Sequence, residues 1–244
     1  MNDYNNNNNN HNNNHVFFFT YATDLSHPFL INIKKDFPDI KILENLSMRH
    51  YNSNKIISLL SNLSRNDNFI NDDDYVIFLD GYDIFPCKKF QNQKELVDIF
   101  LTYKSPIVFG AEKNVFPPKW KKNYQYLYQQ QPLFLSFPMR YLNSGFFMGK
   151  KKDIMLMLST IFEKHYDNKM QRLQSISDQD LFTEYFFNNL DKVVLDIHSH
   201  LVLNCHDVSL ENVMDMHNKK KTFFLHFNGG SKKYMKNFHI LLQK

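Results

Sequence analysis

Tyr75-Val-Ile-Phe-Leu-Asp80-Gly-Tyr-Asp83-Ile-Phe85 is the stretch that decides the fold of this chain. Its first five residues are apolar or aromatic, which predicts a strand buried on both faces of a parallel sheet. The run ends on Asp80, and a turn-permissive Gly81 separates it from Asp83. Ligands of open α/β sheets bind beyond the carboxyl ends of the strands, and two carboxylates there suit a hard divalent cation. The alternative is an ordinary Asp-Gly turn with solvated acids.

The segments on either side alternate between strand and helix patterns. Strands are predicted at residues 15–21, 39–43, 75–80, 106–111, 140–149, 192–196, 201–205 and 223–226. Helices are predicted at 54–63, 94–103, 153–165 and 233–242, with one more ending at Ile33 and one beginning at Ser177. This alternation predicts an α/β fold with a mostly parallel central sheet, formed by a single domain over residues 15–244.

Residues 112–139 fit neither pattern. The segment contains prolines at positions 117, 118, 132 and 138 together with Trp120. A loop of this length in a compact domain is usually functional, so we predict a lid or an acceptor-side wall. The alternative is that its aromatic side chains cover the core.

Composition limits the classes of protein to consider. Residues 1–14 are nearly all asparagine, which predicts a disordered tail. The net charge of +4 comes without a long basic stripe, so no nucleic-acid partner is expected. The chain shows neither a signal-peptide pattern nor an apolar run long enough to span a membrane, and the default expectation is a soluble, cytoplasmic protein. Two cysteines imply no disulfide framework.

Two later stretches contain candidate polar site residues. One lies in a glycine-containing strand, and the other lies at the start of a predicted helix. Leu142-Asn143-Ser144-Gly145 lies in a strand that carries two of the six glycines, which indicates close backbone approach. Ser177 can cap a helix whose first turn contains Asp178 and Asp180. Helix capping alone would account for both of these acids.

The stretch from Phe223 to Lys232 combines a metal-binding side chain with a potential anion site. An apolar strand ends on His226, and Asn228-Gly229-Gly230-Ser231-Lys232 follows before a helix. Backbone amides at such a turn, together with a lysine, can bind a phosphate. The alternative is a plain connection between a strand and a helix.

Taken in order, these stretches resemble the glycosyltransferase domain of the procollagen lysyl hydroxylases and related collagen-modifying glycosyltransferases. The matching pieces are Tyr21-Ala-Thr-Asp24, Asp80-Gly-Tyr-Asp83, Leu142-Asn-Ser-Gly145, Ser177-Asp-Gln-Asp-Leu-Phe182 and His226-Phe-Asn-Gly-Gly-Ser-Lys232. The resemblance spans residues 16–238. It implies a GT-A (Rossmann-like) fold, a UDP-sugar donor and Mn²⁺.

The resemblance also implies roles for individual residues. Metal ligands would be Asp80, Asp83 and His226. Donor-binding residues would be Tyr82 against the uracil, the backbone near Thr20 and Tyr21 at its edge, and Asn228, Gly229 and Lys232 near the diphosphate. Residues facing the donor sugar and the acceptor would be Asn143, Asp178 and Asp180.

The activity implied is transfer of glucose from UDP-glucose to galactosyl-hydroxylysine of a collagen-like protein, with retention at the anomeric carbon. One alternative is transfer of galactose from UDP-galactose to hydroxylysine itself. A second, from a different class, is an inactive UDP-binding scaffold. Assembly into a homo-oligomer is possible in each case.

The chain departs from the family pattern at three places. Either Phe116 or Trp120 takes the position of the family's lid tryptophan, so the acceptor contacts stay open. The segment Asp178-Gln179-Asp180 leaves a one-residue ambiguity over which acid faces the reaction. Phe227 stands where the family has glycine. No dioxygenase domain follows, so lysyl hydroxylation is not expected.

Two alternative functions, a phosphatase and a zinc site, can also be considered from residues of this sequence. A haloacid-dehalogenase-type phosphatase requires its second aspartate two residues after the first, whereas Asp80 and Asp83 are three apart. A zinc site would use His198, His200, Cys205 and His206. Histidines of this kind are more often surface groups or hydrogen-bonded core groups.

Overall fold

The computed structural model describes residues 14–43, 53–65, 69–87, 93–166, 176–219 and 221–242. The predicted disordered tail, residues 1–14, falls almost entirely outside these ranges. Across the described part of the chain, every helix is too short or too polar to cross a membrane.

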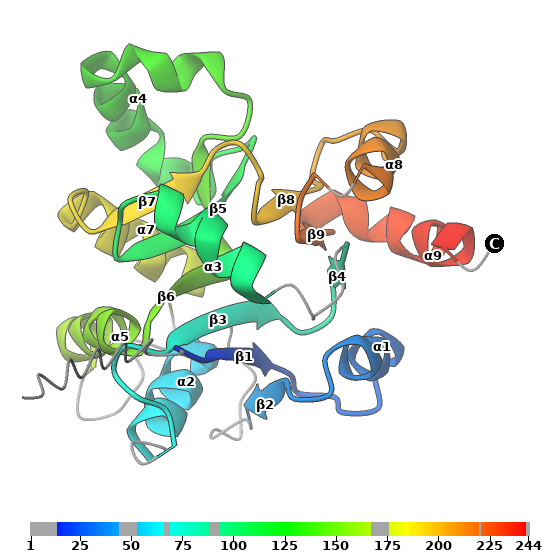
Figure 1. Ribbon diagram of the computed structural model, residues 1–244. Helices are drawn as coiled ribbons and strands as arrows, with labels where there is room; N and C mark the ends of the chain where they lie inside the picture. The colour runs from blue at the N-terminus through cyan, green and yellow to red at the C-terminus, as the bar shows by residue number, and fades with distance from the viewer. Residues whose placement is uncertain are drawn as a thin grey trace, which may run out of the picture.

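A six-stranded sheet forms the centre of the molecule, with strand order β2-β1-β3-β6-β5-β7 (Figure 1). Its strands are β1 (Val16–Tyr21), β2 (Lys41–Leu43), β3 (Tyr75–Asp80), β5 (Ile107–Glu112), β6 (Tyr141–Lys150) and β7 (Val193–Asp196). Only β6 is antiparallel to its neighbours, β3 and β5; the other pairs are parallel. The predicted α/β class with a mostly parallel sheet is therefore confirmed.

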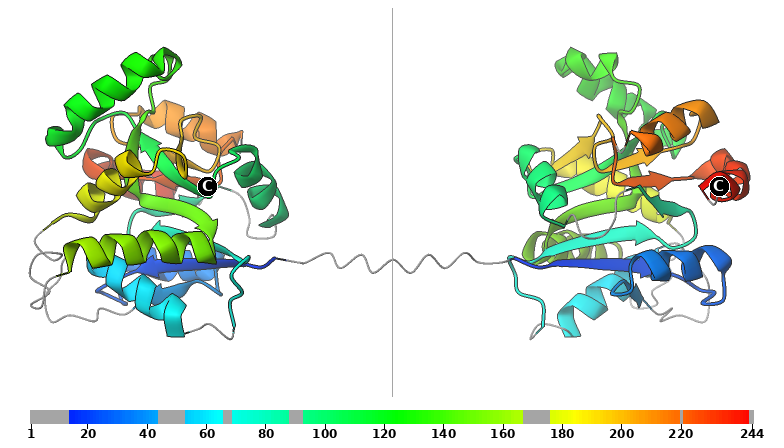
Figure 2. Two further views of the ribbon diagram at one scale, coloured as in Figure 1. Left: turned by 90° about the vertical axis from the view of Figure 1, so that its left-hand side faces the viewer. Right: turned by 45° about the vertical axis from the view of Figure 1, so that its right-hand side comes forward.

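Helices cover both faces of this sheet (Figure 2). One face packs against α2 (Asn54–Arg65), α5 (Lys151–His165) and α7 (Asp178–Asn188), and the other against α1 (Pro28–Asp36) and α3 (Gln93–Thr102). Side chains of β3 alternate between the two cores: Phe78 joins the first, and Ile77 and Leu79 join the second. Burial on both sides explains the unbroken apolar run in the sequence.

A second, three-stranded sheet brings the C-terminal part of the chain back to the end of β3. It consists of β4 (Ile84–Pro86), β9 (Phe224–His226) and β8 (Val202–Asn204), with β9 in the middle. His226 pairs with Ile84, so the register places it beside Asp83. The remaining elements here are α8 (Leu210–Asn218), η4 (Gly229–Ser231) and α9 (Lys232–Leu242). The sequence patterns did not predict α8.

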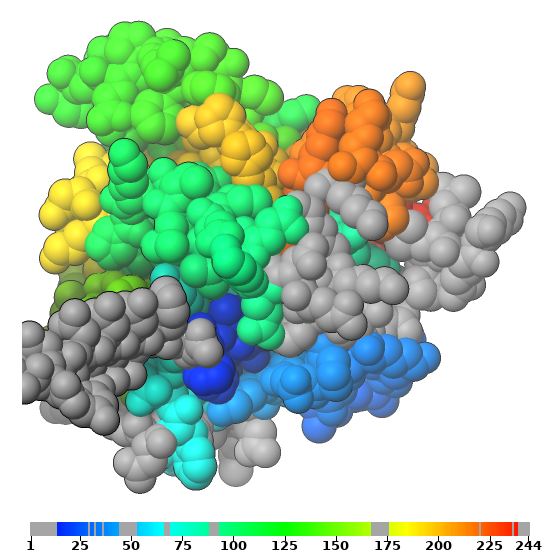
Figure 3. Space-filling view, viewed as in Figure 1, coloured from blue at the N-terminus to red at the C-terminus, as the bar shows by residue number. Residues whose placement is uncertain are grey.

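The prediction of a long loop at residues 112–139 is wrong. After β5 the chain forms η2 (Pro118–Trp120), α4 (Lys121–Gln130) and η3 (Pro132–Ser136), which project as a lobe at one end of the molecule (Figure 3). Tyr124 and Tyr128, one helical turn apart, are buried, and the Tyr124 hydroxyl accepts a hydrogen bond from the Leu142 amide at 3.0 Å. Packing against the core therefore stabilises a helix of modest intrinsic propensity. The alternative interpretation of this segment, in which its aromatic side chains cover the core, holds for Tyr124 and Tyr128.

Candidate active site

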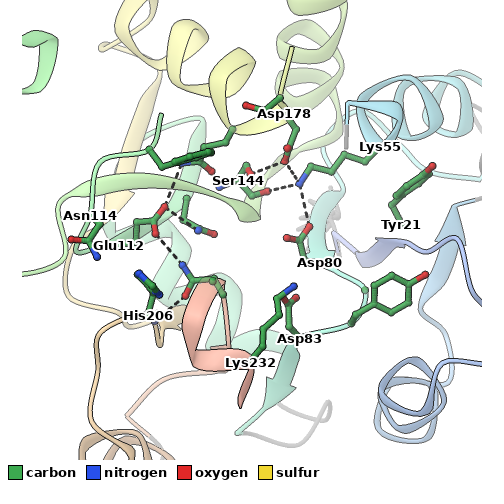
Figure 4. A pocket seen from close by; sticks show the side chains of 18 of the residues that line it. Tyr21, Lys55, Asp80, Asp83, Glu112, Asn114, Ser144, Asp178, His206 and Lys232 are labelled. Atoms are coloured by element: carbon green, nitrogen blue, oxygen red, sulfur yellow. Dashed lines mark hydrogen bonds and ion pairs between the residues drawn. The ribbon is translucent and has the colours of Figure 1, made fainter. Parts of the chain in front are cut away.

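A cavity of about 610 Å³ lies at the carboxyl edge of the central sheet. The ends of β1, β3 and β5 meet there with the first residues of β6, because β6 runs in the opposite direction, and with the N-terminal ends of α2 and α7 (Figure 4). Most of the predicted site residues line this cavity: Tyr21, Asp80, Tyr82, Asp83, Asn143, Asp178, Asn228, Gly229 and Lys232. His226 is buried beside it, and Thr20 and Asp180 are not among the lining residues.

Asp80, Asp83 and His226 lie together at this edge. The His226 Nε2 atom is 3.4 Å from Asp83 Oδ1 and 3.7 Å from Asp80 Oδ2, and one potential ligand atom from each residue lies within 4.8 Å of the others. Within the described ranges, this is the single group of three or more potential metal ligands. The four residues considered for zinc, His198, His200, Cys205 and His206, do not form such a group.

The hydrogen bonds of His226 fix the tautomer that a metal requires. Asn204 Nδ2 donates to the Ala111 carbonyl at 2.9 Å, which turns Asn204 Oδ1 toward His226 Nδ1 at 2.7 Å. His226 Nδ1 therefore carries a hydrogen, and Nε2 is the ring atom that remains to bind a cation when the imidazole is neutral. Nε2 is buried without a hydrogen-bond partner. The Asn204 amide orients the imidazole, and the buried Nε2 atom faces two carboxylates, an arrangement that fits a divalent cation.

Gly145 makes room for this cluster. A Cβ atom at position 145 would lie 2.2 Å from His226 Cε1 and 2.8 Å from Asp80 Oδ2. The register between β5 and β6 also shifts here, from Phe109 paired with Phe147 to Gly110 paired with Asn143. Such bulges occur next to active sites, where they change the direction of side chains. The close approach predicted from the strand glycines is therefore found at Gly145, where the side chains of His226 and Asp80 pack against the backbone.

Buried charges set the protonation of the cluster. Burial raises the pKa of Asp80, and the charge of Asp83 adds to this. Burial also disfavours the charged form of Asp83, but His226 and Lys232 outweigh it and lower its pKa to about 2. The Lys232 Nζ atom lies 2.9 Å from Asp83 Oδ2. For His226, the two aspartates outweigh burial and raise the pKa of the imidazole.

Lys55 is a central residue of the site that sequence reasoning missed. It is 5% exposed and contacts Asp80 Oδ1 at 3.1 Å, the Ser144 carbonyl at 3.2 Å and the Asp178 carboxylate. Burial opposes ionisation of Asp178, but Lys55 and Ser144 outweigh it and lower its pKa. A signal was present: Lys55 precedes the buried Leu59 by one helical turn, so it belongs to the inward face of α2.

Glu112 is the second residue that was missed. It ends β5, is 6% exposed, and accepts hydrogen bonds from the side-chain amides of Asn143 at 3.2 Å, Gln179 at 3.4 Å and Asn228 at 2.9 Å. Burial raises its pKa to about 7, because these neutral amides and His226 offset the burial only in part. Its position after an apolar strand, like that of Asp80, was the available signal.

Tyr21 lies on the side of the cavity away from Glu112 (Figure 4). Tyr82 lines the same cavity. The Tyr82 hydroxyl accepts hydrogen bonds from the backbone amides of Thr23 and Asp24, both at 2.6 Å, which fixes its ring at the rim. Thr20 is fully buried one residue before Tyr21. The loop after β1 and the Gly-Tyr turn after β3 therefore form one surface.

The Gly229-Gly230 turn packs directly against His206. Gly229 adopts a φ of +54°, and a Cβ atom there would lie 2.8 Å from His206 Nδ1. The Gly230 amide donates to the same nitrogen at 3.0 Å, and the His206 amide donates to Asn228 Oδ1 at 3.0 Å. His206 thus lines the cavity and braces the turn that precedes Lys232.

The structure distinguishes the members of two pairs that the sequence left open, Phe116 and Trp120, and Asp178 and Asp180. Phe116 lines the cavity and is 56% exposed, whereas Trp120 stacks on Phe187 and donates from Nε1 to Asp180 Oδ1 at 2.7 Å. In the same way, Asp178 lines the cavity, and Asp180 binds Lys119 Nζ at 2.6 Å outside it. Phe116 and Asp178 are therefore the members of each pair that face the cavity.

Comparison with known proteins agrees with this geometry. The crystal structure of a glycosyltransferase involved in the glycosylation of the major capsid of PBCV-1 has a similar fold, with a TM-score of 0.59 and 11% sequence identity over 93% of this chain and 99% of that chain. The fold is thus that of a GT-A glycosyltransferase. The sequence profile described as the PLOD GT domain, the glycosyltransferase domain of procollagen lysyl hydroxylases, matches residues 44–240. The chain belongs to this family. No curated protein matches it significantly in sequence.

Proposed function

We propose that this protein is a metal-dependent, retaining glycosyltransferase that moves glucose from UDP-glucose to galactosyl-hydroxylysine of a collagen-like acceptor. The observation that carries the proposal is the buried His226 Nε2, which has no hydrogen-bond partner and faces Asp80 and Asp83 beside the cavity of a glycosyltransferase-family chain. Mn²⁺ suits this set of one imidazole and two carboxylates. The volume of about 610 Å³ falls within the range of sites for nucleotide-sized ligands.

The donor nucleotide would occupy the wall formed by Tyr82 and Tyr21. Tyr82 is held by the amides of Thr23 and Asp24, so its ring can stack on the uracil without losing further side-chain freedom. The diphosphate would then lie near Lys232 and the Gly229 turn. A bound divalent cation would neutralise the charge that gathers on the diphosphate as the sugar bond breaks. Lys232, released from Asp83, would add a second positive charge there.

The sugar and the acceptor hydroxyl would lie between Asp178 and Glu112. The lowered pKa of Asp178 keeps its carboxylate ionised, as needed to stabilise positive charge on an oxocarbenium-like sugar. Glu112, with its pKa raised to about 7, is suited to accept a hydrogen bond from the acceptor hydroxyl. Phe116 at the rim offers an exposed aromatic face to an acceptor sugar. We assign no covalent intermediate, and front-side attack accounts for retention.

The experiment is a UDP-release assay with UDP-glucose and UDP-galactose, with and without Mn²⁺, on galactosyl-hydroxylysine and hydroxylysine peptides. The proposal predicts metal-dependent release that requires the galactosylated peptide and prefers UDP-glucose. Release from UDP-galactose on bare hydroxylysine would replace it with the galactosyltransferase alternative. Metal-dependent UDP binding without release from either donor would indicate a UDP-binding scaffold instead.

A further inference from the structure

The buried ammonium group of Lys55 lies between two carboxylates that the proposed function uses differently. Asp80 Oδ1 forms an ion pair with Lys55, and Asp80 Oδ2 faces His226. Asp178, at the start of α7, forms an ion pair with Lys55 from the other side (Figure 4). Ser144 joins the same group: its carbonyl accepts from Lys55 Nζ, and its hydroxyl donates to Asp178 Oδ2 at 2.7 Å. The lysine therefore separates a carboxylate of the metal cluster from a carboxylate of the sugar side.

All three N–H donors of Lys55 have partners in this arrangement. They point to Asp80, Asp178 and the Ser144 carbonyl, and the ammonium group also lies 5.2 Å from the centre of the Phe78 ring. A substrate could bind Lys55 only by displacing one of these groups. Lys55 is thus a positioning residue and not a donor to the substrate.

Removing this charge would change where Asp178 can bind. Without Lys55, the side chain of Asp178 would keep Ser144 as its hydrogen-bond donor and would lie close to a site that already holds Asp80, Asp83 and His226. Hard divalent cations accept additional carboxylate oxygens readily. The positive charge of a bound cation would then draw Asp178 away from the sugar.

We propose that Lys55 keeps Asp178 out of the coordination sphere of the cation and so reserves it for the sugar. This inference rests on the proposed function. It predicts opposite effects on two properties: loss of Lys55 strengthens metal binding and weakens transfer. A lysine that only supported the fold would weaken both together.

The experiment compares Lys55→Met, Lys55→Arg, Asp178→Asn and the double variant Lys55→Met/Asp178→Asn. Mn²⁺ affinity is measured by electron paramagnetic resonance of free Mn²⁺ in the presence of UDP, and transfer by kcat and KM. Lys151→Met is the matched control, because Lys151 is also a buried lysine but binds the Ile70 carbonyl outside the cavity. Thermal midpoints of all variants identify losses due to folding.

We expect Lys55→Met to bind Mn²⁺ about tenfold more tightly, because a positive charge beside the site is lost and a carboxylate is gained. Its kcat should fall about 100-fold, as expected when a group at the reaction centre is misplaced. Asp178→Asn alone should change Mn²⁺ affinity by less than about threefold, and in the double variant most of the gain should disappear. Lys55→Arg keeps the charge and should retain wild-type metal affinity. Lys151→Met should leave both properties unchanged.

Three results would overturn the inference. Weaker Mn²⁺ binding by Lys55→Met would show that Lys55 only supports Asp80. Tighter binding that persists in the double variant would show a charge effect without movement of Asp178. Unchanged kcat in Lys55→Met would show that the position of Asp178 does not matter. If Lys55→Met does not fold, Lys55→Gln, which removes the charge but keeps a hydrogen-bond donor for Asp178 or Ser144, supplies the comparison, with tighter Mn²⁺ binding and lower kcat again expected. Absence of transfer by the wild-type protein would contradict the proposed function, while the metal titrations would still test Lys55.

Discussion

Asp83 and Glu112 are buried carboxylates on two sides of one cavity, and their pKa values move in opposite directions. Asp83 lies between His226 and Lys232, which outweigh burial and lower its pKa to about 2. Glu112 has only neutral amides as hydrogen-bond donors, and burial raises its pKa to about 7. Both carboxylates are buried, so the difference between their pKa values comes from their neighbours: charged groups beside Asp83 and neutral amides beside Glu112.

This difference divides the cavity into an ionic half and an amide half. The ionic half contains Asp80, Asp83 and Asp178 with two lysines and a histidine, and the lowered pKa values of Asp83 and Asp178 keep these two acids charged. The amide half holds one acid whose charge can change near neutral pH. The ionic half is thus suited to bind metal and diphosphate, and the amide half to handle the acceptor proton.

The largest effect is expected from Asp83→Asn, which removes a carboxylate from the ionic half. On the proposed function, transfer should fall by about three orders of magnitude, because the cation would lose a charged ligand and would be held less tightly against the diphosphate. The assay is UDP release over a Mn²⁺ titration. Asp73→Asn is the control: Lys150 and Lys152 also lower the pKa of Asp73 to about 2, but on the surface. Wild-type transfer by Asp83→Asn at the same Mn²⁺ concentration would remove the basis of the comparison.

A smaller but more specific effect is expected from Glu112→Gln. If the ionised form assists transfer, wild-type kcat should rise with pH around a midpoint near the pKa of about 7. The glutamine variant should be slower by about 100-fold at pH 8 and should lose this pH dependence. Saturating Mn²⁺ at each pH removes the effect of metal-ligand protonation. A variant that keeps the wild-type pH profile would assign the midpoint to another group.

The same variant should be more stable than the wild type in alkaline solution. The pKa of Glu112 is raised from 4.5 to about 7 in the folded protein, so its stabilising contribution is present below pH 4.5 and is lost as the pH rises through 7. At pH 8 the wild-type protein carries the cost of a buried charge, and Glu112→Gln should raise the free energy of unfolding by about 1 to 3 kcal/mol. Urea unfolding at pH 5 and pH 8 measures this difference. Equal stability changes at both pH values would contradict it.

Asn143→Ala tests whether the amides control Glu112. Its side chain donates to Glu112 Oε1, and this hydrogen bond lowers the pKa of the carboxyl group. The midpoint of the pH profile should therefore move upward by about half a unit to one unit, which lowers the ionised fraction of Glu112, and with it kcat, at pH 7 by about two- to fivefold. Asn188→Ala is the control, because its amide binds the Glu184 carbonyl within α7. An unmoved midpoint would show that Asn143 acts on the substrate only.

The sequence predicts the ionic half better than the amide half, and the reason is physical. Asp80 and His226 end the apolar strands β3 and β9, and Asp83 follows in the turn after β3, so local patterns identify each of them as a polar group at a strand end. The two strands belong to different sheets, and only the family resemblance implied that these three residues act together. Glu112 also ends a strand, but its partners lie 31, 67 and 116 positions away along the chain. No local pattern shows that three neutral amides surround it. Its raised pKa is therefore visible only in the folded structure.

Elements stabilised by distant contacts were missed for the same reason. Residues Lys121–Gln130 form α4 although their sequence is polar and contains three tyrosines. The helix depends on Tyr124 and Tyr128, which pack against residues of α7 and β6. Lys55 was missed because a lysine is ordinarily assigned to the exposed face of a helix. Here two carboxylates from β3 and α7 reverse that expectation.

The smallest effect is expected from Asp180→Asn. Asp180 lies two residues after Asp178, and both were predicted to face the sugar and the acceptor. Its carboxylate instead binds Lys119 and Trp120, which join η2 to α7 outside the cavity. An asparagine can still accept from Trp120, and the ion pair with the exposed Lys119 is worth about 0.5 kcal/mol. Transfer should therefore change by less than about twofold, with a slightly lower thermal midpoint.

Asp178→Asn is the matched comparison. It makes the same chemical change at the aspartate on the other side of Gln179. It removes the charge bound by Lys55 and should lower kcat by about 100-fold while UDP still binds. Measuring kcat and UDP affinity for both variants shows which carboxylate belongs to the ionic half of the cavity. If Asp180→Asn loses transfer while Asp178→Asn keeps it, η2 must reposition Asp180 toward the substrate. The boundary of the ionic half would then move outward to include Lys119.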